Sequence, residues 1–373
     1  MRVFQTIHKY NPHIPWFEEK YGIHDASGHS FNDIQRLLIE DGYASAYILQ
    51  PALEGKTEEV FFTLWNYERL QKLWAKEHGM QTDNLQEIKR AQIEEYKPDV
   101  FYDFSAMLDR DFIQKYAIAS SIKKVAWYGI IEKQPELLND YDLRVTLHRP
   151  YLSYWNERKL KAFELQPAFD TRWEQYDKKD KSIDILFYGQ FLNRILGYRN
   201  DFVTQLLKYA SEEKDLNIKI HLQLQSPRKV RKKIFGIGIP KIHEKFPSDF
   251  VVQHALPPIY GQQLYSTIGQ SKFVINGYGN HNVHFKSNMR LFEALGCGSL
   301  LISERGNYPE GFLEQMHYIP YDIHRARKTI NSLKGIVAQY QTIYQQQHQA
   351  IQEVKQRYAK QLQWERFKQQ VAL

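Results

Sequence analysis

The sequence contains a single cysteine, Cys297, and no apolar run of about 18 residues, the length that a membrane span requires. One cysteine excludes an internal disulfide. The absence of a long apolar run argues against a membrane-spanning helix. The opening segment, Met1–His8, is too short and too polar for a signal peptide and predicts a first strand instead. We therefore expect a cytoplasmic protein, with peripheral contact to the inner face of a membrane left open.

Several motifs of catalysis and nucleotide binding are also absent. There is no G-x-x-x-x-G-K-[ST] phosphate loop and no G-x-S-x-G nucleophile elbow, and Gly236–Gly238 lacks the third glycine of a dinucleotide fingerprint. Asp140 and Asp142 fall in a polar run, and His281 and His284 have no nearby carboxylate, so neither pair has the pattern of a metal site. We expect a metal-independent protein that needs no cofactor.

The 373 residues suffice for two domains, each with its own core. A hydrophobic content of 43% and an aromatic content of 14% are too high for a disordered chain. The net charge of +7 suits a nucleic acid, an anionic membrane surface or a phosphorylated substrate as partner. The basic cluster at residues 228–233 fits contact with anionic lipid or a phosphorylated acceptor, or is a solvated charge run.

Strand-like and helix-like segments alternate through the first half, which predicts an α/β domain with a parallel sheet. The long connection over residues 9–29 indicates a functional loop. Ser30 is predicted to cap a helix that starts at Phe31, with Asp33 completing the cap. The remaining expected elements are strands at Val3–Ile7, Ala46–Leu49, Pro98–Phe104, Val125–Tyr128 and Leu143–Leu147, and helices at 60–78 and 84–95.

The alternation restarts after a polar linker, Asp177–Ser182. From about Arg325 onward an apolar stripe at helical spacing predicts one or two helices. The expected strands are Ile183–Tyr188, Ile218–Leu224, Phe250–Gln253, Phe273–Asn276 and Leu300–Ile302, with helices at Asp201–Ala210, from Tyr260 and from Ser287.

The segment Ser287–Ser303 predicts a short helix, a glycine turn and a buried strand. Ser287 is a candidate N-cap, and Gly296 is a candidate left-handed stop. Arg290 lies in the first turn, where the helix dipole disfavours a cation, so an anion bound there would explain it. Glu293 follows at i+3, where its carboxylate can accept two ribose hydroxyls. The alternative is an exposed Arg290–Glu293 pair.

Residues Arg290–Ser303, RLFEALGCGSLLIS, resemble the donor-site signature of group 1-type glycosyltransferases with the GT-B fold, and most of all the spore-maturation-type branch. The similarity continues through Phe312 to Asp322. Ile183–Gly189, followed by Arg199, resembles the opening strand and loop of the same domain. Many retaining relatives have a second Glu where this chain has Phe285, so the resemblance does not decide between inversion and retention.

The resemblance implies an α/β protein with two Rossmann-like domains and a C-terminal helix that crosses back to the first. We expect an acceptor-binding domain at 1–176, a nucleotide-sugar-binding domain at 183–324 and a helical segment at 325–373. The implied activity is transfer of a sugar, as by a hexosyltransferase, from a nucleotide-diphosphate donor to an acceptor hydroxyl in an interdomain cleft, in polysaccharide or glycoconjugate biosynthesis. The acceptor is a glycan, a lipid-linked intermediate, a small molecule or a protein.

Transfer requires groups that hold the diphosphate, the ribose and the base, and direct inversion also requires a proton acceptor. Glu293 is the candidate ribose ligand, and His254 is expected near the base. The diphosphate candidates are Arg194, Arg199, Lys286, Ser287, Asn288 and Arg290; for Arg194 and Arg199 the alternative is ordinary surface charge. The candidate proton acceptors are Asp25, His29 and Asp103.

Two other functions remain open at this point. One is a catalytically inactive GT-B protein that works as a binding module. The other is a basic nucleic-acid-binding protein, which has the required charge but none of the familiar motifs. We therefore expect no nucleic-acid partner.

Overall fold

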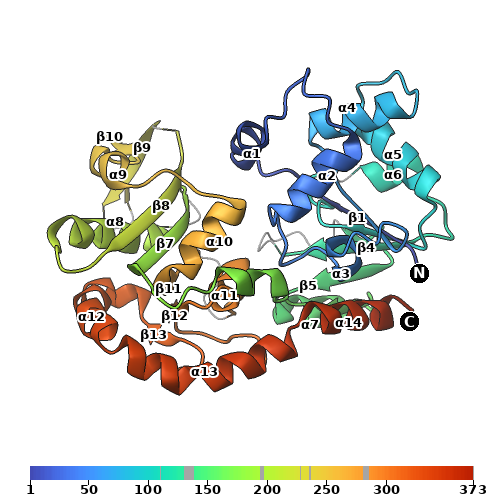
Figure 1. Cartoon of the computed structure of the whole chain (residues 1–373). Coiled ribbons are helices and arrows are strands. Elements are labelled where there is room, and N and C mark those ends of the chain that lie inside the picture. The colour runs from blue at the N-terminus through green and yellow to red at the C-terminus, as the bar shows by residue number, and fades with distance from the viewer. Residues whose placement is uncertain are drawn as a thin grey trace. The chain divides into compact units, whose positions relative to one another are not determined.

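The computed structural model describes residues 1–109, 111–129, 138–193, 197–226, 228–234, 237–279 and 285–372. Its internal contacts divide the chain into two compact units. Unit 1 comprises Met1–Thr171 together with Arg357–Leu373, and unit 2 comprises Arg172–Gln356. Both units combine helices with a parallel sheet (Figure 1), so the predicted α/β class is confirmed.

Unit 1 is built on a six-stranded sheet in the order β2-β1-β3-β4-β5-β6. Every neighbouring pair in this sheet is parallel. Strands β1, β3 and β5 are buried along their whole length, as expected when helices cover both faces of a sheet. The strands are β1 (Val3–Ile7), β2 (Val60–Leu64), β3 (Val100–Asp103), β4 (Lys123–Tyr128), β5 (Leu143–Thr146) and β6 (Ala162–Glu164).

Helices connect these strands. The predicted cap of α2 is confirmed, because the Ser30 hydroxyl accepts from the Asp33 amide at 3.1 Å and the Asp33 carboxylate accepts from the Ser30 amide at 3.0 Å. The helices are α1 (His13–Tyr21), α2 (Phe31–Glu40), α3 (Gln50–Leu53), α4 (Glu68–Glu77), α5 (Leu85–Tyr96), α6 (Phe112–Tyr116) and α7 (Arg149–Glu157).

The second strand was predicted in the wrong place. The segment Ala46–Leu49 is a turn that leads into α3, and its side chains are apolar because Ala46, Ile48 and Leu49 lie in the core. The second strand is β2, which the prediction had included in a helix over 60–78. Its sequence VFFTL is rich in the β-branched and aromatic residues that favour strands. The connection over 9–29 also contains α1.

Unit 2 has a five-stranded sheet in the order β13-β12-β11-β7-β8, again parallel throughout. Its strands are β7 (Ile183–Phe191), β8 (Ile218–Leu224), β11 (Ser271–Asn276), β12 (Leu300–Glu304) and β13 (Ile319–Tyr321). Its helices are α8 (Gly197–Glu212), α9 (Asp249–His254), α10 (Gly261–Gly269), α11 (Met289–Gly296), α12 (Ala326–Ala338) and α13 (Tyr340–Arg357), with short 3₁₀ turns at Thr171–Tyr176 and Ile323–Arg325.

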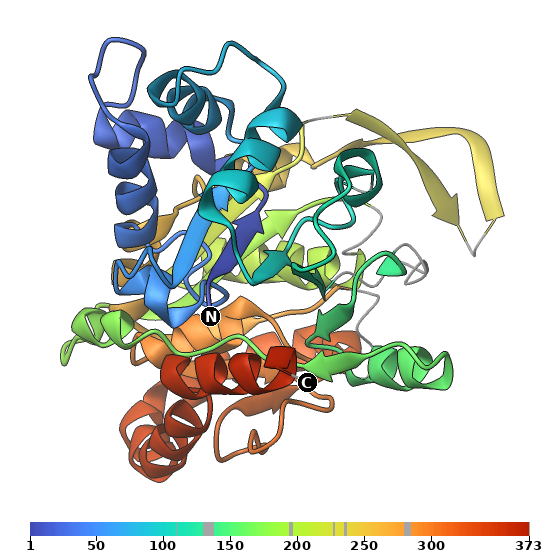
Figure 2. The ribbon, with the colours of Figure 1, turned by 90° about the vertical axis from the view of Figure 1, so that its right-hand side faces the viewer.

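Two elements of unit 2 differ from the prediction. Residues 250–253, expected as a strand, belong to helix α9, because the Ser248 hydroxyl caps it by accepting from the Val251 amide. The basic cluster, for which the sequence predicted neither helix nor strand, lies in strand β9 (Arg228–Ile234). This strand pairs with β10 (Ile237–Phe246) in an antiparallel sheet of two strands that is separate from the main sheet (Figure 2).

The C-terminal helix α14 (Lys360–Ala372) belongs to unit 1, so the predicted crossing back is confirmed. Phe367 is fully buried, with its ring 4.7 Å from that of Tyr102, and the Lys360 ammonium donates to the Ile48 carbonyl at 2.9 Å. The boundaries predicted for the domains stay predictions. Within the described ranges, none of the helices has the length and hydropathy needed to cross a membrane.

Candidate functional site

The site is built around helix α11. Its N-cap is Asn288, whose side-chain oxygen accepts from the Leu291 amide at 3.1 Å. The prediction of Ser287 as the cap was therefore wrong by one residue, because Asn288 is the last residue with extended backbone. Gly296 is likewise not the left-handed stop. That conformation falls on Gly298, whereas Gly296 gives room to a ring: a Cβ there would lie 2.5 Å from Trp173.

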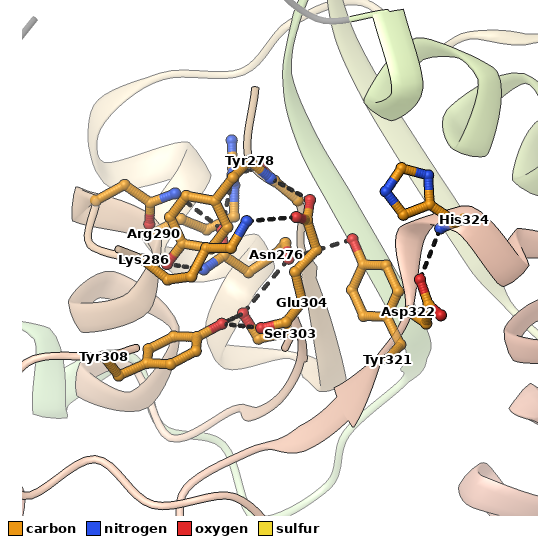
Figure 3. Close-up of polar contacts among 12 residues, drawn as sticks. Asn276, Tyr278, Lys286, Arg290, Ser303, Glu304, Tyr308, Tyr321, Asp322 and His324 are labelled. Carbon is orange, nitrogen blue, oxygen red and sulfur yellow. Dashed lines mark hydrogen bonds and ion pairs between the residues drawn. The ribbon is translucent and has the colours of Figure 1, made fainter. Parts of the chain in front are cut away.

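Asn276, the last residue of β11, connects the start of α11 to the sheet. Its side-chain oxygen accepts from Arg290 Nη1 at 2.9 Å and from Asn288 Nδ2 at 3.0 Å. Its amide nitrogen donates to the Tyr278 hydroxyl at 3.0 Å. Figure 3 shows this group together with the ends of β12 and β13. One amide thus fixes the direction of both Arg290 and the helix cap.

The guanidinium of Arg290 has only neutral partners. Besides Asn276, Nη1 donates to the Gly277 carbonyl at 3.4 Å, and the group lies 4.9 Å from the centroid of the Tyr188 ring. Among the residues that the structure describes, no carboxylate forms an ion pair with it, and Nε has no partner. Arg290 is therefore not neutralised by a direct ion pair at the start of α11, although its charge acts on Glu293.

Gly189, on β7, leaves the space that the guanidinium of Arg290 occupies. Gly189 has φ +150°, a region that other residues rarely adopt. A Cβ on Gly189 would lie 2.7 Å from Nη2 of Arg290. The guanidinium consequently lies directly against the backbone near the end of β7.

A second arginine, Arg199, lies in the first turn of α8. It is buried, and its Nη2 donates to the carbonyl of Gln190 on β7. Burial, and after it the positive charge of Arg290, lower the pKa of Arg199 to about 9. Both arginines lie close to Gly277, since Arg290 Nη1 donates to its carbonyl and a Cβ on Gly277 would lie 3.0 Å from Cγ of Arg199. Two cations without carboxylate partners in the described chain thus meet at the carboxyl ends of β7 and β11. This arrangement suits a bound anion.

Lys286, a predicted diphosphate ligand, already has an anionic partner. Its ammonium is 2.8 Å from Oε2 of Glu304, and both side chains are buried. The other Glu304 oxygen accepts from the Tyr278 amide at 2.6 Å (Figure 3). The ion pair neutralises Lys286, and Glu304 connects Lys286 with the backbone of Tyr278. Its role as a diphosphate ligand stays a prediction.

Glu293 is buried on α11, with 6% of its surface exposed. The Tyr188 hydroxyl donates to its Oε2 at 2.8 Å. Burial raises the pKa of Glu293, although this hydrogen bond opposes the shift. Arg290 and Glu293, both described, form no ion pair, so the alternative of an exposed surface pair is wrong. The role of Glu293 as a ribose ligand stays a prediction.

Three other residues were predicted to bind the donor, namely His254, Ser287 and Arg194. His254 is exposed at the end of α9, and its hydrogen bond and its ring contact are both to Phe250. Ser287 is buried beside the cap. Arg194 lies outside the described residues. The roles of all three stay predictions.

In unit 1 the structure brings two of the three proton-acceptor candidates together. Asp25 and His29 both line a hollow of about 820 Å³. Asp25 forms an ion pair with Arg69, and His29 Nδ1 is 2.8 Å from the Ser27 hydroxyl.

Asp103, the third candidate, does not line this hollow. It is fully buried at the end of β3, where it accepts from the Tyr141 hydroxyl at 2.8 Å and from the Ser105 amide at 2.7 Å. Burial raises its pKa. No group of three or more His, Cys, Asp or Glu side chains in the described part of the chain is arranged to hold a metal ion.

Several residues of the site were not predicted. Asn276 was expected only as the end of a strand, although an asparagine at the carboxyl end of a buried strand is a recognisable signal. Tyr188, Gly189 and Glu304 gave no comparable signal, because each depends on a contact between segments about 18 to more than 100 residues apart in the chain.

Comparison with known proteins supports the fold. Residues 205–371 match the model of a family described as glycosyl transferase-like. The structure is similar to Anabaena HepE in complex with UDP-glucose, with a TM-score of 0.60, 10% identity, and 100% of this chain and 98% of HepE covered. It is similar to the sucrose-phosphate synthase of Thermosynechococcus elongatus, with a TM-score of 0.54, 11% identity and 99% and 98% covered.

A glycosyltransferase from Rickettsia africae is a third similar structure, with a TM-score of 0.53, 9% identity and 99% and 97% covered. No curated protein matches the chain. Identities this low establish the fold and no more. The chain has the GT-B fold, as the resemblance implied, and its assignment to the spore-maturation-type branch stays a prediction.

Proposed function

We propose that the protein is a glycosyltransferase that uses a nucleotide-diphosphate sugar as donor, and that its donor diphosphate binds at the start of α11. The observation that carries this proposal is the pair Arg199 and Arg290. Both cations lie at the carboxyl ends of parallel strands, where α/β proteins bind ligands, and within the described residues neither forms an ion pair with a carboxylate, although the charge of Glu304 acts on Arg199 from further away. HepE, which shares the fold, was solved with UDP-glucose.

The chemistry of the donor explains why arginines are suitable here. When the sugar leaves, negative charge increases on the diphosphate, and groups that stabilise this charge accelerate the reaction. A guanidinium offers several N–H donors in fixed directions to phosphate oxygens. The free backbone N–H groups at the start of α11 add the positive end of the helix dipole. These residues would stabilise the leaving group without a metal ion.

Glu293 is the proposed ribose ligand. It lies one turn after Arg290 on the same helix, so a ribose joined to the bound phosphate would come near it. Its raised pKa indicates that the carboxylate is poorly solvated and gains from hydrogen-bond donors. Ribose hydroxyls are donors of this kind.

If transfer proceeds with inversion, His29 is the residue that we propose takes the proton from the hydroxyl of the acceptor substrate. When Nδ1 of His29 carries the hydrogen and donates it to the Ser27 hydroxyl, Nε2 keeps a lone pair that can accept a proton. Asp25 is exposed but is already paired with Arg69, and Asp103 is buried away from solvent, so His29 is preferred over both. We include a hexose as the sugar of the donor in this proposal. The acceptor is a glycan, a lipid-linked intermediate, a small molecule or a protein.

Calorimetric titration of UDP and of uridine tests the donor site. Charge-assisted hydrogen bonds contribute roughly 1.5–3 kcal/mol each, so Arg290→Ala is expected to weaken UDP binding about ten- to a hundred-fold. Binding of uridine should change little, because the lost contact is to phosphate. Arg327→Ala, on the exposed face of α12, removes the same charge elsewhere and is the control.

Two further results complete the test. Equal affinity for UDP in the parent and in Arg290→Ala would refute the diphosphate site. Hydrolysis of UDP-sugars by the parent, measured as released UDP, separates a transferase from an inactive binding module. If the protein binds a nucleotide sugar but turns over none of the UDP-, GDP- and ADP-sugars with any acceptor of a panel, the proposal that it is a transferase is wrong.

A further inference from the structure

The hollow of unit 1 that Asp25 and His29 line takes no part in the donor site. Its volume of about 820 Å³ lies within the range of about 300–1,000 Å³ that is usual for small-molecule sites. Helices α1, α2 and α4 and the loop of residues 24–30 form its walls (Figure 1). It lies at the carboxyl ends of two parallel strands, because Lys9 follows β1 and Tyr67 follows β2. Ligands of α/β proteins bind at this edge of a sheet, so the position of the hollow indicates a ligand.

Hydrogen bonds between its elements fix the walls of the hollow. Arg69, on α4, donates from Nε to Glu18 on α1 at 2.9 Å and from Nη1 to Asp25 in the loop. Glu77, also on α4, accepts from the Phe31 amide at the start of α2 at 2.8 Å. A site whose walls are already held in place loses less conformational entropy when it binds a ligand.

The charges of the lining distinguish between classes of ligand. Among the described residues that line the hollow, four are cations and four are carboxylates, so these charges balance. The cations are Lys9, Arg69, Lys72 and Lys76. The carboxylates are Glu18, Asp25, Glu68 and Glu77. A phosphorylated ligand favours an excess of cations, so the lining suits an uncharged ligand better.

The apolar part of the lining is small. Its aliphatic side chains, among the residues that the structure describes, are Ile14, Ile34 and Leu73. A lipid chain gains little where charged groups surround it, because the hydrophobic effect requires an apolar environment. A hydroxyl group, in contrast, donates to carboxylates and accepts from ammonium groups. The lining therefore matches an uncharged molecule with many hydroxyl groups, and a glycan is such a molecule.

Two charged groups of the lining are available to hydroxyl groups. In the described part of the chain, neither the Lys9 ammonium nor the Glu68 carboxylate forms a hydrogen bond or a direct ion pair. Two other cations of the lining already have carboxylate partners, because Arg69 pairs with Asp25 and Lys72 Nζ lies 3.0 Å from Oδ1 of Asp83. The charge of Glu68 acts on Lys72 only from further away.

We propose that this hollow binds an uncharged glycan as the acceptor substrate, with Glu68 accepting from its hydroxyl groups and Lys9 donating to them. The role of the glycan as acceptor rests on the proposed transferase function, whereas its binding does not. His29 lines the same hollow, so a hydroxyl of the bound glycan can reach it. In an inverting transfer the glycan oxygen bonds to the anomeric carbon of the donor sugar, the bond from that carbon to the diphosphate breaks, and His29 takes the proton.

Saturation-transfer NMR on the full chain, without a donor, tests the binding of glycans. The probes are the methyl glycosides of glucose, galactose, mannose and N-acetylglucosamine and the phosphate esters of the same sugars. At least one methyl glycoside should bind, and more tightly than the corresponding phosphate ester. Each hydrogen bond to a charged group contributes about ten- to a hundred-fold in affinity. Lys9→Ala/Glu68→Ala should therefore weaken binding of that glycoside by more than tenfold, and each single variant should show part of the loss.

Glu94→Ala/Lys115→Ala is the matched control, because it removes one exposed residue of each charge elsewhere in unit 1. Both double variants keep the net charge of the parent. The control should bind the glycoside as the parent does, and equal melting temperatures show that the variants are folded. If the control loses as much glycoside binding as Lys9→Ala/Glu68→Ala, the hollow is not the glycan site.

Turnover then connects the hollow to the transferase reaction. With the nucleotide sugar that the parent turns over fastest, the bound glycoside should raise nucleotide release above that in water alone. Lys9→Ala/Glu68→Ala should raise the KM of the glycoside more than it lowers kcat. Glycoside binding that this variant loses, without turnover of any nucleotide sugar, would support the glycan site and contradict the transferase. Tighter binding of the phosphate esters, or no binding of any methyl glycoside, would overturn the glycan site and leave the test of Arg290 unaffected.

Discussion

The hydroxyl of Tyr188, on β7, donates a hydrogen bond of 2.8 Å to the buried carboxylate of Glu293, on α11. The same tyrosine ring faces the guanidinium of Arg290. One side chain of the sheet therefore positions both residues that we assign to the donor. Because the carboxylate is buried, its protonation is linked to the stability of the fold.

This linkage gives a prediction for Glu293→Gln. The folded-state pKa of Glu293 is raised above its ordinary value of 4.5. Between these two values the folded state holds more protons than the unfolded state, so the contribution of Glu293 to stability falls as the pH rises. Glutamine does not ionise and lacks this penalty, which is about 1.4 kcal/mol for each tenfold difference in proton affinity between the two states. In urea unfolding, the variant should gain stability relative to the parent between about pH 5 and pH 8.

Glu212→Gln is the control, since Glu212 is exposed on α8. The difference in unfolding free energy between this variant and the parent should be the same at about pH 5 and at about pH 8. A constant difference for Glu293→Gln as well would show that the carboxylate is not desolvated. The same variant should bind UDP about ten- to a hundred-fold more weakly, because a neutral amide is a poorer partner for ribose hydroxyls than a carboxylate.

The proton acceptor gives a second prediction. His29→Ala should lower kcat about 10²- to 10⁴-fold while UDP affinity barely changes, because general base catalysis contributes about this factor. Asp25→Asn and Asp103→Asn are measured beside it. His24→Ala is the control, since His24 lines the same hollow. Near-normal turnover in His29→Ala, Asp25→Asn and Asp103→Asn would exclude all three residues as the general base and favour a retaining reaction.

The C-terminal helix gives a third prediction. Phe367 is fully buried against Tyr102, so Phe367→Ala should destabilise the protein by about 3–5 kcal/mol. Leu362→Ala, at a position 44% exposed in the same helix, should cost little. Deletion of residues 341–373 should lower both the melting temperature and the solubility. A truncated protein that melts as the parent does would show that the helix does not support unit 1.

A fourth prediction concerns a buried ion pair in unit 1. Lys89 Nζ and Asp109 Oδ2 are 2.6 Å apart, and both side chains are at most 1% exposed. Lys89→Met leaves the Asp109 carboxylate buried without its cationic partner, with the neutral Gln86 still donating to it, and should cost about 3–5 kcal/mol. Lys89→Met/Asp109→Asn removes both charges and should recover most of that loss. A double variant as unstable as the single one would show that the cost comes from packing around Lys89.

The sequence predicted most of the fold because its signals are local. Buried runs such as Leu300–Ile302 and the cap at Ser30 depend on neighbouring residues only. Where the prediction failed, tertiary structure decided. Ala46–Leu49 is apolar because it fills the core, and residues 250–253 form a helix because Ser248 caps it.

The candidate site was predictable only in part for the same reason. Arg290 was singled out by its place in the first turn of a helix, which is a local feature. The compensation of Lys286 by Glu304 and the hydrogen bond from Tyr188 to Glu293 join distant segments, and no local pattern announces them. The hollow that collects Asp25 and His29 also exists only after folding.

The close approach of Arg290 to Gly189 restricts which sequences can build this site. Any side chain at position 189 would occupy the space of the guanidinium, and the backbone there suits glycine alone. A chain in which another residue replaces this glycine must hold its arginine elsewhere or lose it. The two positions are therefore expected to vary together in other proteins of this fold, and the glycine at the end of the first strand of the unit becomes a marker for an arginine about a hundred residues further along the chain.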